Sequence, residues 1–278
     1  MKEQVQFVRL VGQERRAGES LSSISKHWQH GKERFMVISP HDDDAVLGAG
    51  LLIQLAQQEE VPVYIIIVTD GSMGYCSFDE KESIAKIRQQ ETFEAYESLG
   101  VPRENIIWLG YPDCQINNYR GRSKNDTGEK LEIKGFKGLQ NSFTYYLREI
   151  NPTQCFLPTC NDLHPDHRIV YDEFLISVFH ACGDIWPELG APLSKVPYIH
   201  EAAVYCDFSS PPTLRITTPE SYLDKKLKAI SFFRSQKQIS SLIENVRSCG
   251  AQEYIKSIMF NLYEPKKYYD IFEDNKAS

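Results

Sequence analysis

Several features that would place this chain in a membrane or outside the cell are missing from its sequence. The longest purely apolar run, residues 63–68, is far shorter than the roughly 20 residues that a membrane-spanning helix needs. The N-terminal segment MKEQVQFVRLVGQERR has neither an apolar core nor a small-residue cleavage site, so we expect no secretory signal. The seven cysteines are odd in number and form no CxxC pair, which indicates reduced thiols. These absences favour a cytoplasmic protein without a membrane span.

Positive charge is also in short supply. Lys and Arg total 31 against 38 Asp and Glu, which gives a formal net charge of −7 at pH 7. This balance does not suit a protein held on nucleic acid or anionic lipid by bulk charge. Hydrophobic residues make up 41% of the chain, enough for a sizeable core. We therefore expect residues 1–278 to form a single large domain, and the sequence leaves a homo-oligomer open.

Strand-like and helix-like segments alternate along most of the chain. Short apolar runs predict strands at 35–38, 61–68, 106–109, 153–157 and 202–207. Apolar residues at helical spacing predict helices at 45–58, 79–99, 136–150, 168–180 and 221–235. Repetition of strand and helix is typical of an α/β fold with a mostly parallel sheet and helices on both faces.

Three segments interrupt this alternation. Residues 1–33 precede the first predicted strand and resemble an amphipathic helix or an ordered arm. Residues 114–135 are polar and too long for an ordinary connection, and residues 183–200 carry three prolines. We expect both of these later segments to be active-site loops, with a small hairpin as the alternative for residues 114–135.

Polar and titratable residues stand directly after four of the predicted strands. They are residues 41–44 (His-Asp-Asp-Asp), Asp70, Asp113 and residues 164–167 (His-Pro-Asp-His). Each has a structural alternative, since an Asp run can simply cap a helix and Asp70 before Gly71 can make a turn. Because the carboxyl ends of parallel strands meet at one edge of a sheet, their joint occurrence favours a functional site.

The residue types at this edge predict a metal ion. Closely spaced carboxylates cannot all stay ionised without a cation among them. A mixture of imidazole and carboxylate favours zinc or another first-row divalent metal over magnesium or calcium. His41 and Asp44 can chelate one ion, and a second histidine from residues 164–167 would complete three ligands. Three protein ligands with a position left for water are typical of a catalytic zinc site.

The motifs resemble those of a known family, the LmbE-like (PIG-L) zinc-dependent N-deacetylases. The segment SPHDDDAVLGAG is similar to the family's first motif, AHPDDExLGxGG, and HPDH at 164–167 is similar to its second. Further similarities are RQQE at 88–91, LGYPD at 109–113 and the late segment KKLKA…SQ at 225–236. The resemblance extends over about residues 34–240 and implies a Rossmann-like three-layer sandwich.

Carried over position by position, the resemblance implies the parts of a catalytic zinc site. His41, Asp44 and His167 would hold one zinc ion per chain. Asp43 would be the general base. His164 would polarise the amide carbonyl or stabilise the oxyanion.

The resemblance also implies supporting residues. Arg88 and Asp113 would bind sugar hydroxyls. Asp166 and Asp70 would contact the metal ligands without binding the metal themselves. Asp42 occupies the position of the family's proline and offers an extra carboxylate behind the ligands. The choice of Asp43 over Asp42 as the base therefore depends on the motif register alone.

The activity implied by the resemblance is a metal-dependent N-deacetylase. Such an enzyme removes the acetyl group from an N-acetylglucosamine-type sugar conjugate and gives acetate and a free amino sugar. One alternative is a metal-dependent amidase on another N-acyl substrate, such as an acylated aminoglycoside or a glycopeptide intermediate. Another is a non-catalytic sugar or nucleotide-binding module, which the lack of GxGxxG after the first predicted strand disfavours.

Overall fold

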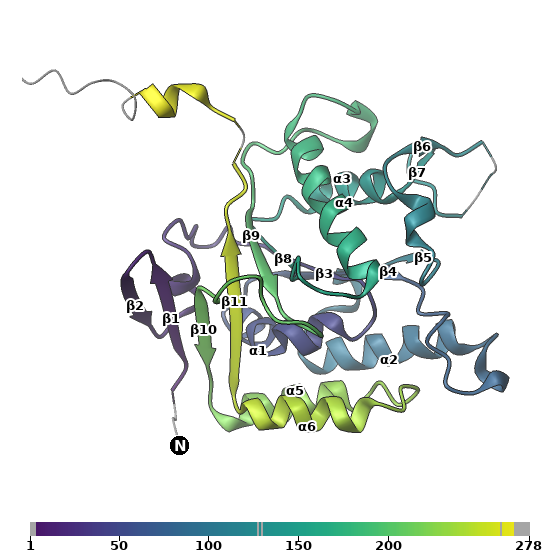
Figure 1. The fold of residues 1–278 in the computed structure, drawn as a ribbon, viewed down its shortest axis with the longest axis horizontal. Coiled ribbons are helices and arrows are strands. Elements are labelled where there is room, and N and C mark those ends of the chain that lie inside the picture. Colours follow the sequence, from purple (N-terminus) through teal and green to yellow (C-terminus); the bar gives the residue numbers. More distant parts are fainter. Residues whose placement is uncertain (1–3, 127, 129, 262, 270–278) are drawn as a thin grey trace, which may run out of the picture.

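A nine-stranded sheet forms the centre of the protein. The computed structural model describes residues 4–126, 128, 130–261 and 263–269. The strand order is β2-β1-β10-β11-β9-β8-β3-β4-β5 (Figure 1). The strands are β1 (Gln6–Val11), β2 (Glu14–Gly18), β3 (Phe35–Ser39), β4 (Val63–Thr69), β5 (Ile106–Tyr111), β8 (Gln154–Pro158), β9 (Tyr198–Ala202), β10 (Leu214–Thr217) and β11 (Gln252–Ile258).

The sheet has a parallel half and an antiparallel half. Strands β9, β8, β3, β4 and β5 run parallel, as the alternation of strands and helices predicts. Strands β2, β1, β10 and β11 continue the same sheet with antiparallel pairing. The expectation of a mixed α/β fold is confirmed, and the antiparallel extension is an addition to it.

The N-terminal segment belongs to this extension. In place of an amphipathic helix, β1 and β2 form a hairpin at the edge of the sheet, and a short 3-10 helix, η1 (Leu21–Ile24), follows. The hairpin turn contains Gly12 with φ +60°, a backbone conformation that glycine adopts without strain. Phe7 on β1 is fully buried in the core, which fixes the hairpin to the rest of the sheet.

Helices cover the two faces of the sheet. One face is covered by α1 (Asp44–Gln58), α2 (Ile84–Ser98) and α5 (Glu220–Ile230), with α6 (Ile239–Cys249) beside α5 (Figure 1). The other face is covered by α3 (Leu139–Ile150) and α4 (Pro165–Cys182). Each layer has its own apolar core, so the sheet is buried on both sides. No helix within the described ranges is long and apolar enough to cross a membrane.

The fifth predicted strand is displaced in the structure. The sequence predicts a strand at 202–207, whereas β9 is Tyr198–Ala202. The difference arises because β9 pairs in parallel with β8, which brings the polar His200 beside Phe156 and close to Gln154. Because His200 is polar, it interrupts the apolar run that would mark β9, and the local pattern favours residues 202–207 instead.

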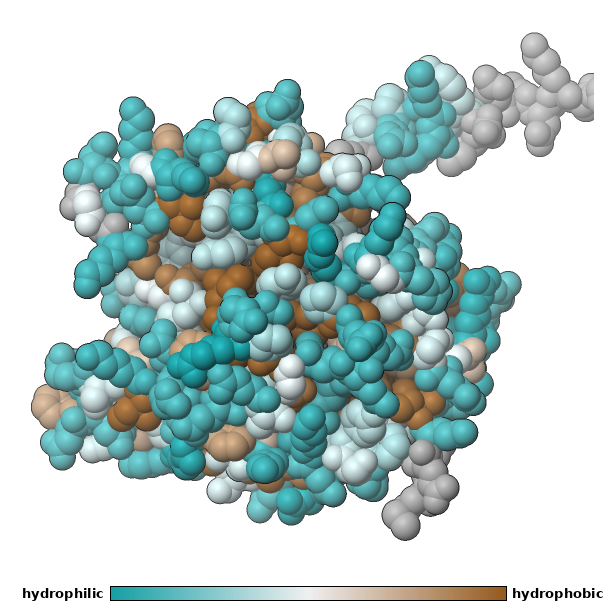
Figure 2. Space-filling model, turned by 180° about the vertical axis from the view of Figure 1, so that it is seen from behind, coloured by the Kyte–Doolittle hydropathy of each residue, from teal (hydrophilic) through white to brown (hydrophobic). Residues whose placement is uncertain are grey.

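The two segments expected as active-site loops lie in different places. Within 114–135, η4 (Ile116–Tyr119) is followed by β6 (Ser123–Lys124), which pairs with β7 (Phe136–Lys137). Within 183–200, residues 194–198 line a cavity of about 620 Å³ beside residues 151–153, at the amino ends of the parallel strands. Figure 2 shows the back of the molecule, where patches of apolar residues are exposed among more hydrophilic ones.

His200 is a buried neutral histidine in this sheet. It is 3% exposed, and its ring stacks on Phe156 with 4.8 Å between centroids. His200 Nε2 lies 2.8 Å from the side-chain oxygen Oε1 of Gln154, and Nδ1 lies 3.0 Å from the Ser257 hydroxyl, a pairing that suits one donor and one acceptor. Burial lowers the pKa of His200 to about 4.

This lowered pKa makes stability depend on pH. The unfolded chain takes up a proton on this histidine below its ordinary pKa of about 6.5, whereas the folded protein does not until about pH 4. Stability is therefore fully present above pH 6.5 and is lost as the pH falls towards 4. We expect His200 to cost about 2 kcal/mol of unfolding free energy between pH 7 and pH 5. Urea unfolding at both pH values should show a smaller loss for His200→Gln than for the unsubstituted protein, and an identical loss would contradict this assignment.

Candidate active site

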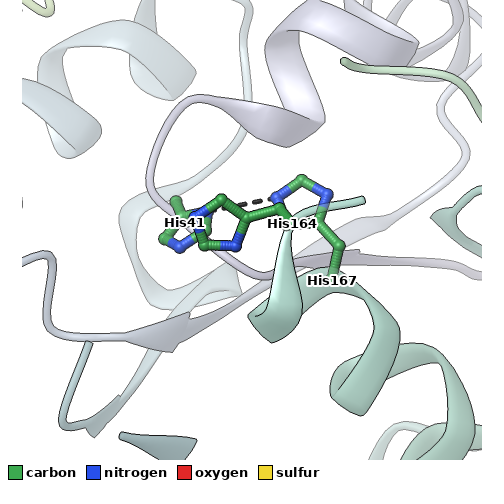
Figure 3. A group of neighbouring side chains, drawn as sticks. All are labelled: His41, His164 and His167. Atoms are coloured by element: carbon green, nitrogen blue, oxygen red, sulfur yellow. Dashed lines mark hydrogen bonds between the residues drawn. The ribbon is translucent and has the colours of Figure 1, made fainter. Parts of the chain in front are cut away.

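Four strand ends deliver polar side chains to one edge of the sheet, as the sequence predicts. Residues 41–44 connect β3 to α1, Asp70 follows β4 and Asp113 follows β5. Residues 164–167 form the start of α4, in the connection after β8. The rings of His41, His164 and His167 gather at this edge, the last two from α4 (Figure 3).

Three ligand atoms from these strand ends form a nearly equilateral triangle. The Asp44 Oδ2 atom lies 3.2 Å from His41 Nδ1 and 3.1 Å from His167 Nε2. The two imidazole nitrogens are 3.1 Å apart. All three side chains are buried, and their donor atoms face a common point.

This triangle fits a tetrahedral zinc ion. Zinc bonds of about 2.0–2.1 Å place tetrahedral ligand atoms about 3.3–3.4 Å apart, close to the observed spacings. Two imidazoles and one carboxylate are also a donor set that first-row divalent metals accept. His41, Asp44 and His167 are therefore able to hold a metal ion with one position left open.

The second nitrogen of each histidine ligand faces a carboxylate. His41 Nε2 lies 3.4 Å from Asp113 Oδ1 and 3.5 Å from Asp166 Oδ2. His167 Nδ1 lies 3.1 Å from Asp162 Oδ2. A carboxylate on the outer nitrogen keeps the proton there and leaves the inner nitrogen free to bind metal.

Asp162 is a site residue that sequence reasoning missed. It is 1% exposed, and its other oxygen accepts the backbone N–H of His164 at 2.9 Å. Asp162 therefore fixes both the ring of His167 and the start of α4. It lies two residues before the HPDH segment, and only this proximity could have pointed to it.

Neighbouring carboxylates raise the pKa values of the two histidines in the triangle. Burial lowers the pKa of His167, but the charge of Asp44 and the hydrogen bond to Asp162 outweigh it and raise this pKa to about 9. Burial also lowers the pKa of His41, and hydrogen bonds to Asp113 and other carboxylates raise it well above its usual value. The site thus strongly favours positive charge at the centre of the triangle.

The two carboxylates before Asp44 have different surroundings. Asp42 Oδ1 accepts from Arg88 Nη1 at 3.0 Å, and the Asp42 side chain is fully buried. Asp43 lines a cavity, and its Oδ2 atom has no hydrogen-bond partner in the described part of the chain. Burial, followed by the charges of Asp44 and Asp42, raises the pKa of Asp43 to about 7. Asp43 is thus the carboxylate that is free to exchange a proton in the cavity.

His164 caps the helix that carries His167. Its Nδ1 atom accepts the backbone N–H of Asp166 at 3.3 Å, so its proton resides on Nε2. Burial and the positive charges of His41 and His167 lower the pKa of His164. The His164 ring is therefore neutral and carries its proton on Nε2, the nitrogen that faces away from the backbone of α4.

Three of the predicted supporting residues hold neighbouring backbone groups by hydrogen bonds. Asp70 Oδ1 accepts the backbone N–H of Asp113 at 3.1 Å and so fixes the chain beside the site. Asp166 Oδ2 accepts the backbone N–H of Cys114 at 2.9 Å. Arg88 pairs with Asp42 and also donates to the carbonyl oxygen of residue 74.

A cavity of about 170 Å³ lies beside the ligand triangle and reaches it at His41. Its lining consists of His41, Asp43, Met73, Gly74, Arg88, Asp113, Cys114, His164, Tyr205, Gln236 and Gln238. Tyr205 and Gln238 come from late parts of the chain that no sequence signal connected to the strand ends, whereas Gln236 is the last residue of the family-like segment at 225–236. Of the segment 114–135, Cys114 lines the cavity.

Comparison with known proteins relates the chain to one family. The family model described as GlcNAc-PI de-N-acetylase (PIG-L) matches residues 36–177, just over half of the chain. A probable N-acetyl-alpha-D-glucosaminyl L-malate deacetylase 2 from Bacillus cereus is 26% identical over 210 residues, which are 72% of this chain and 82% of that protein.

Solved structures share the fold. N,N′-diacetylchitobiose deacetylase from Pyrococcus horikoshii aligns with a TM-score of 0.65 at 24% identity, over 85% of each chain. GalB, the 4-carboxy-2-hydroxymuconate hydratase from Pseudomonas putida, aligns with a TM-score of 0.60 at 16% identity, over 84% of this chain and 98% of that one. One neighbour is named a deacetylase and the other a hydratase, so the fold alone does not decide the reaction.

The role found for Asp162 is open to a direct test. We expect Asp162→Asn to weaken zinc binding by about 10–100-fold, because the His167 ring loses the charged partner that orients it. Titration against a competing chelator measures this affinity. Asp172→Asn makes the same change at an exposed carboxylate of α4 and should leave the affinity unchanged. Equal zinc affinity in the Asp162→Asn variant would rule out this role.

Proposed function

Because the chain belongs to the PIG-L family of GlcNAc-PI de-N-acetylases, we propose that it removes the N-acetyl group from an N-acetylglucosamine-type sugar conjugate. The products are acetate and a free amino sugar. The observation that carries this proposal is the triangle of His41, Asp44 and His167 beside a cavity that is lined by both His41 and Asp43.

Zinc is the cofactor we propose for this site. His41, Asp44 and His167 would hold one ion per chain, and another first-row divalent metal is compatible with the same ligands. When bound, the metal supplies a Lewis acid that polarises the amide carbonyl and lowers the pKa of its water ligand towards about 7.

Asp43 is the proposed general base. Its surroundings support this role, since it lines the cavity and its pKa is raised to about 7. It takes the proton from the attacking water and passes it to the departing amine nitrogen. Asp42 is less suited to this step, because its carboxylate is paired with Arg88 and does not line the cavity.

His164 is the proposed donor to the oxyanion. The Nε2–H group of a neutral ring lies on the side away from the backbone of α4, because Nδ1 is occupied by the N–H of Asp166. A donor positioned in advance stabilises the charge that develops on the carbonyl oxygen. Arg88 and Asp113, which also line the cavity, are the proposed partners of the sugar hydroxyls.

The substrate class is tested by acetate release. The zinc-loaded protein is incubated with N-acetyl-alpha-D-glucosaminyl L-malate, N,N′-diacetylchitobiose and simple N-acetylglucosaminides, and acetate is measured. The first two are suggested by the names of the relatives. Acetate release from at least one of them supports the proposal. Non-sugar N-acyl compounds are assayed beside them, and acetate or acyl release confined to these would favour the broader amidase instead. No acyl release from any of the compounds would overturn amide hydrolysis.

The base assignment predicts a separation of metal binding from turnover. We expect Asp43→Asn to keep one zinc per chain and to lose about 10²–10⁴-fold in kcat, the usual contribution of a general base. Zinc content by elemental analysis and kcat by acetate release are the two measurements. Asp42→Asn serves as the comparison, because it removes the neighbouring carboxylate and should lose much less of kcat. A fully active Asp43→Asn variant would refute the assignment.

A further inference from the structure

Helix α1, which begins at the ligand Asp44, is broken after its first turn. Ala49 has φ −140° and ψ 21°, which lies outside the helical region. The break separates a short turn, residues 44–48, from a regular helix at residues 50–58. The short turn is helical itself, since the N–H of Leu47 donates to the Asp43 carbonyl oxygen at 3.0 Å.

A buried ion pair is inserted at the break. In an unbroken helix the N–H of Leu51 would donate to the carbonyl oxygen of Leu47. Here Lys226 Nζ donates to the Leu47 carbonyl oxygen at 2.8 Å, and Glu253 Oε1 accepts the Leu51 N–H at 2.6 Å. Lys226 Nζ and Glu253 Oε1 are themselves 2.7 Å apart. The ion pair therefore takes the place of the helical hydrogen bond between Leu51 and Leu47.

The other contacts of Glu253 and Lys226 also stabilise the break in α1. Glu253 Oε2 accepts the N–H of Leu52 at 2.9 Å, so the carboxylate caps the start of the second helical part. The ammonium of Lys226 lies at the end of the first part, where a positive charge is favourable. Both side chains are only 4% exposed, so each depends on the other for charge compensation.

Gly50 leaves room for this pair. A Cβ atom at residue 50 would lie 3.0 Å from Lys226 Cγ and 3.1 Å from Lys226 Cδ. The stem of Lys226 therefore passes directly against the backbone of α1. Lys226 comes from α5 and Glu253 from β11, so two distant segments hold the break in place.

The break affects the candidate metal site because the short turn carries Asp44. Asp44 begins this turn, and its Oδ2 atom is one corner of the ligand triangle, 3.1 Å from His167 Nε2. A single turn has no continuous helix to set its direction. Its carbonyl end is held by Lys226, and its other end continues into β3.

We propose that the Lys226–Glu253 ion pair is a positioning device for the metal ligand Asp44. By holding α1 in its broken form, it sets the direction of the first turn and with it the place of the Asp44 carboxylate relative to the two histidines. Lys226 and Glu253 act through the backbone of α1 and do not touch the ligand atoms. This inference rests on the proposed metal site and adds to it two residues outside the cavity.

A double variant tests the proposal without leaving a buried charge. A single substitution would strand an uncompensated ion and could unfold the protein, whereas apolar replacement of a whole buried pair is often tolerated. In Lys226→Met/Glu253→Leu the Leu51 N–H is free to bond directly to the Leu47 carbonyl oxygen. We expect α1 to straighten and the Asp44 carboxylate to move away from His167.

Two measurements decide the outcome. A crystal structure of the double variant should show the direct bond from Leu51 to Leu47 and an Asp44–His167 separation clearly longer than 3.1 Å. Zinc affinity, measured against a competing chelator, should fall by about 10–100-fold, the range seen when groups supporting a ligand are lost.

Arg148→Met is the matched control. Arg148 is also a buried cation that donates to backbone carbonyl oxygens, including those of residues 180 and 181 in α4. It lies at the end of α4 away from His167. We expect this variant to lose stability while keeping the zinc affinity of the unsubstituted protein.

Unchanged positions of Asp44 and His167 in the double variant would overturn the proposal, as would unchanged zinc affinity. An equal loss of affinity in Arg148→Met would overturn it too, because the effect would then be general destabilisation. Neither measurement requires turnover. Failure of the proposed deacetylation is therefore distinguishable from failure of this inference.

Discussion

The burial of several carboxylates around His41 is the constraint on which the site depends. Charges removed from water are costly unless a group of opposite charge compensates them. Arg88 compensates Asp42, and the two histidines compensate Asp44. The Oδ2 atom of Asp43 has no hydrogen-bond partner among the described residues, and burial with the charges of Asp44 and Asp42 raises the Asp43 pKa to about 7. The same crowding therefore produces both an attraction for a cation and a carboxylate able to exchange protons near neutral pH.

The two halves of the sheet contribute differently to this arrangement. The parallel half brings the residues at 41–44, Asp113 and the start of α4 together, because its carboxyl ends meet at one edge. The antiparallel half adds nothing to the ligand triangle. Its strand β11 supplies Glu253, which holds the break in α1. An extension that looks peripheral is thus connected to the site through a single buried ion pair.

Sequence reasoning succeeded where the signal is local. The strands β3, β4, β5 and β8 and the helices after them follow from apolar patterns, and the approach of residues 41–44 to residues 164–167 follows from their order. The choice of His167 between the two histidines came from the family resemblance. It failed where pairing between distant segments decides the structure. The position of β9 depends on its register with β8, and the N-terminal hairpin depends on a core that the segment cannot reveal alone. Asp162 and Tyr205 escaped notice because only three-dimensional proximity gives them a role.

The residues proposed for the chemistry lie within the family match, whereas part of the cavity that would receive the substrate lies outside it. The family match ends at residue 177 and contains the ligand triangle, Asp43 and His164. The cavity beside them, about 170 Å³, is smaller than the 300–1,000 Å³ typical of pockets that enclose a whole drug-sized ligand. It can therefore receive the acetamide end of a conjugate while the remainder extends past the rim. Part of that rim is Tyr205, Gln236 and Gln238, which lie beyond the family match. We therefore expect the contacts that distinguish one conjugate from another to come from these rim residues, and the proposed cleavage of the amide to depend on residues within the family match.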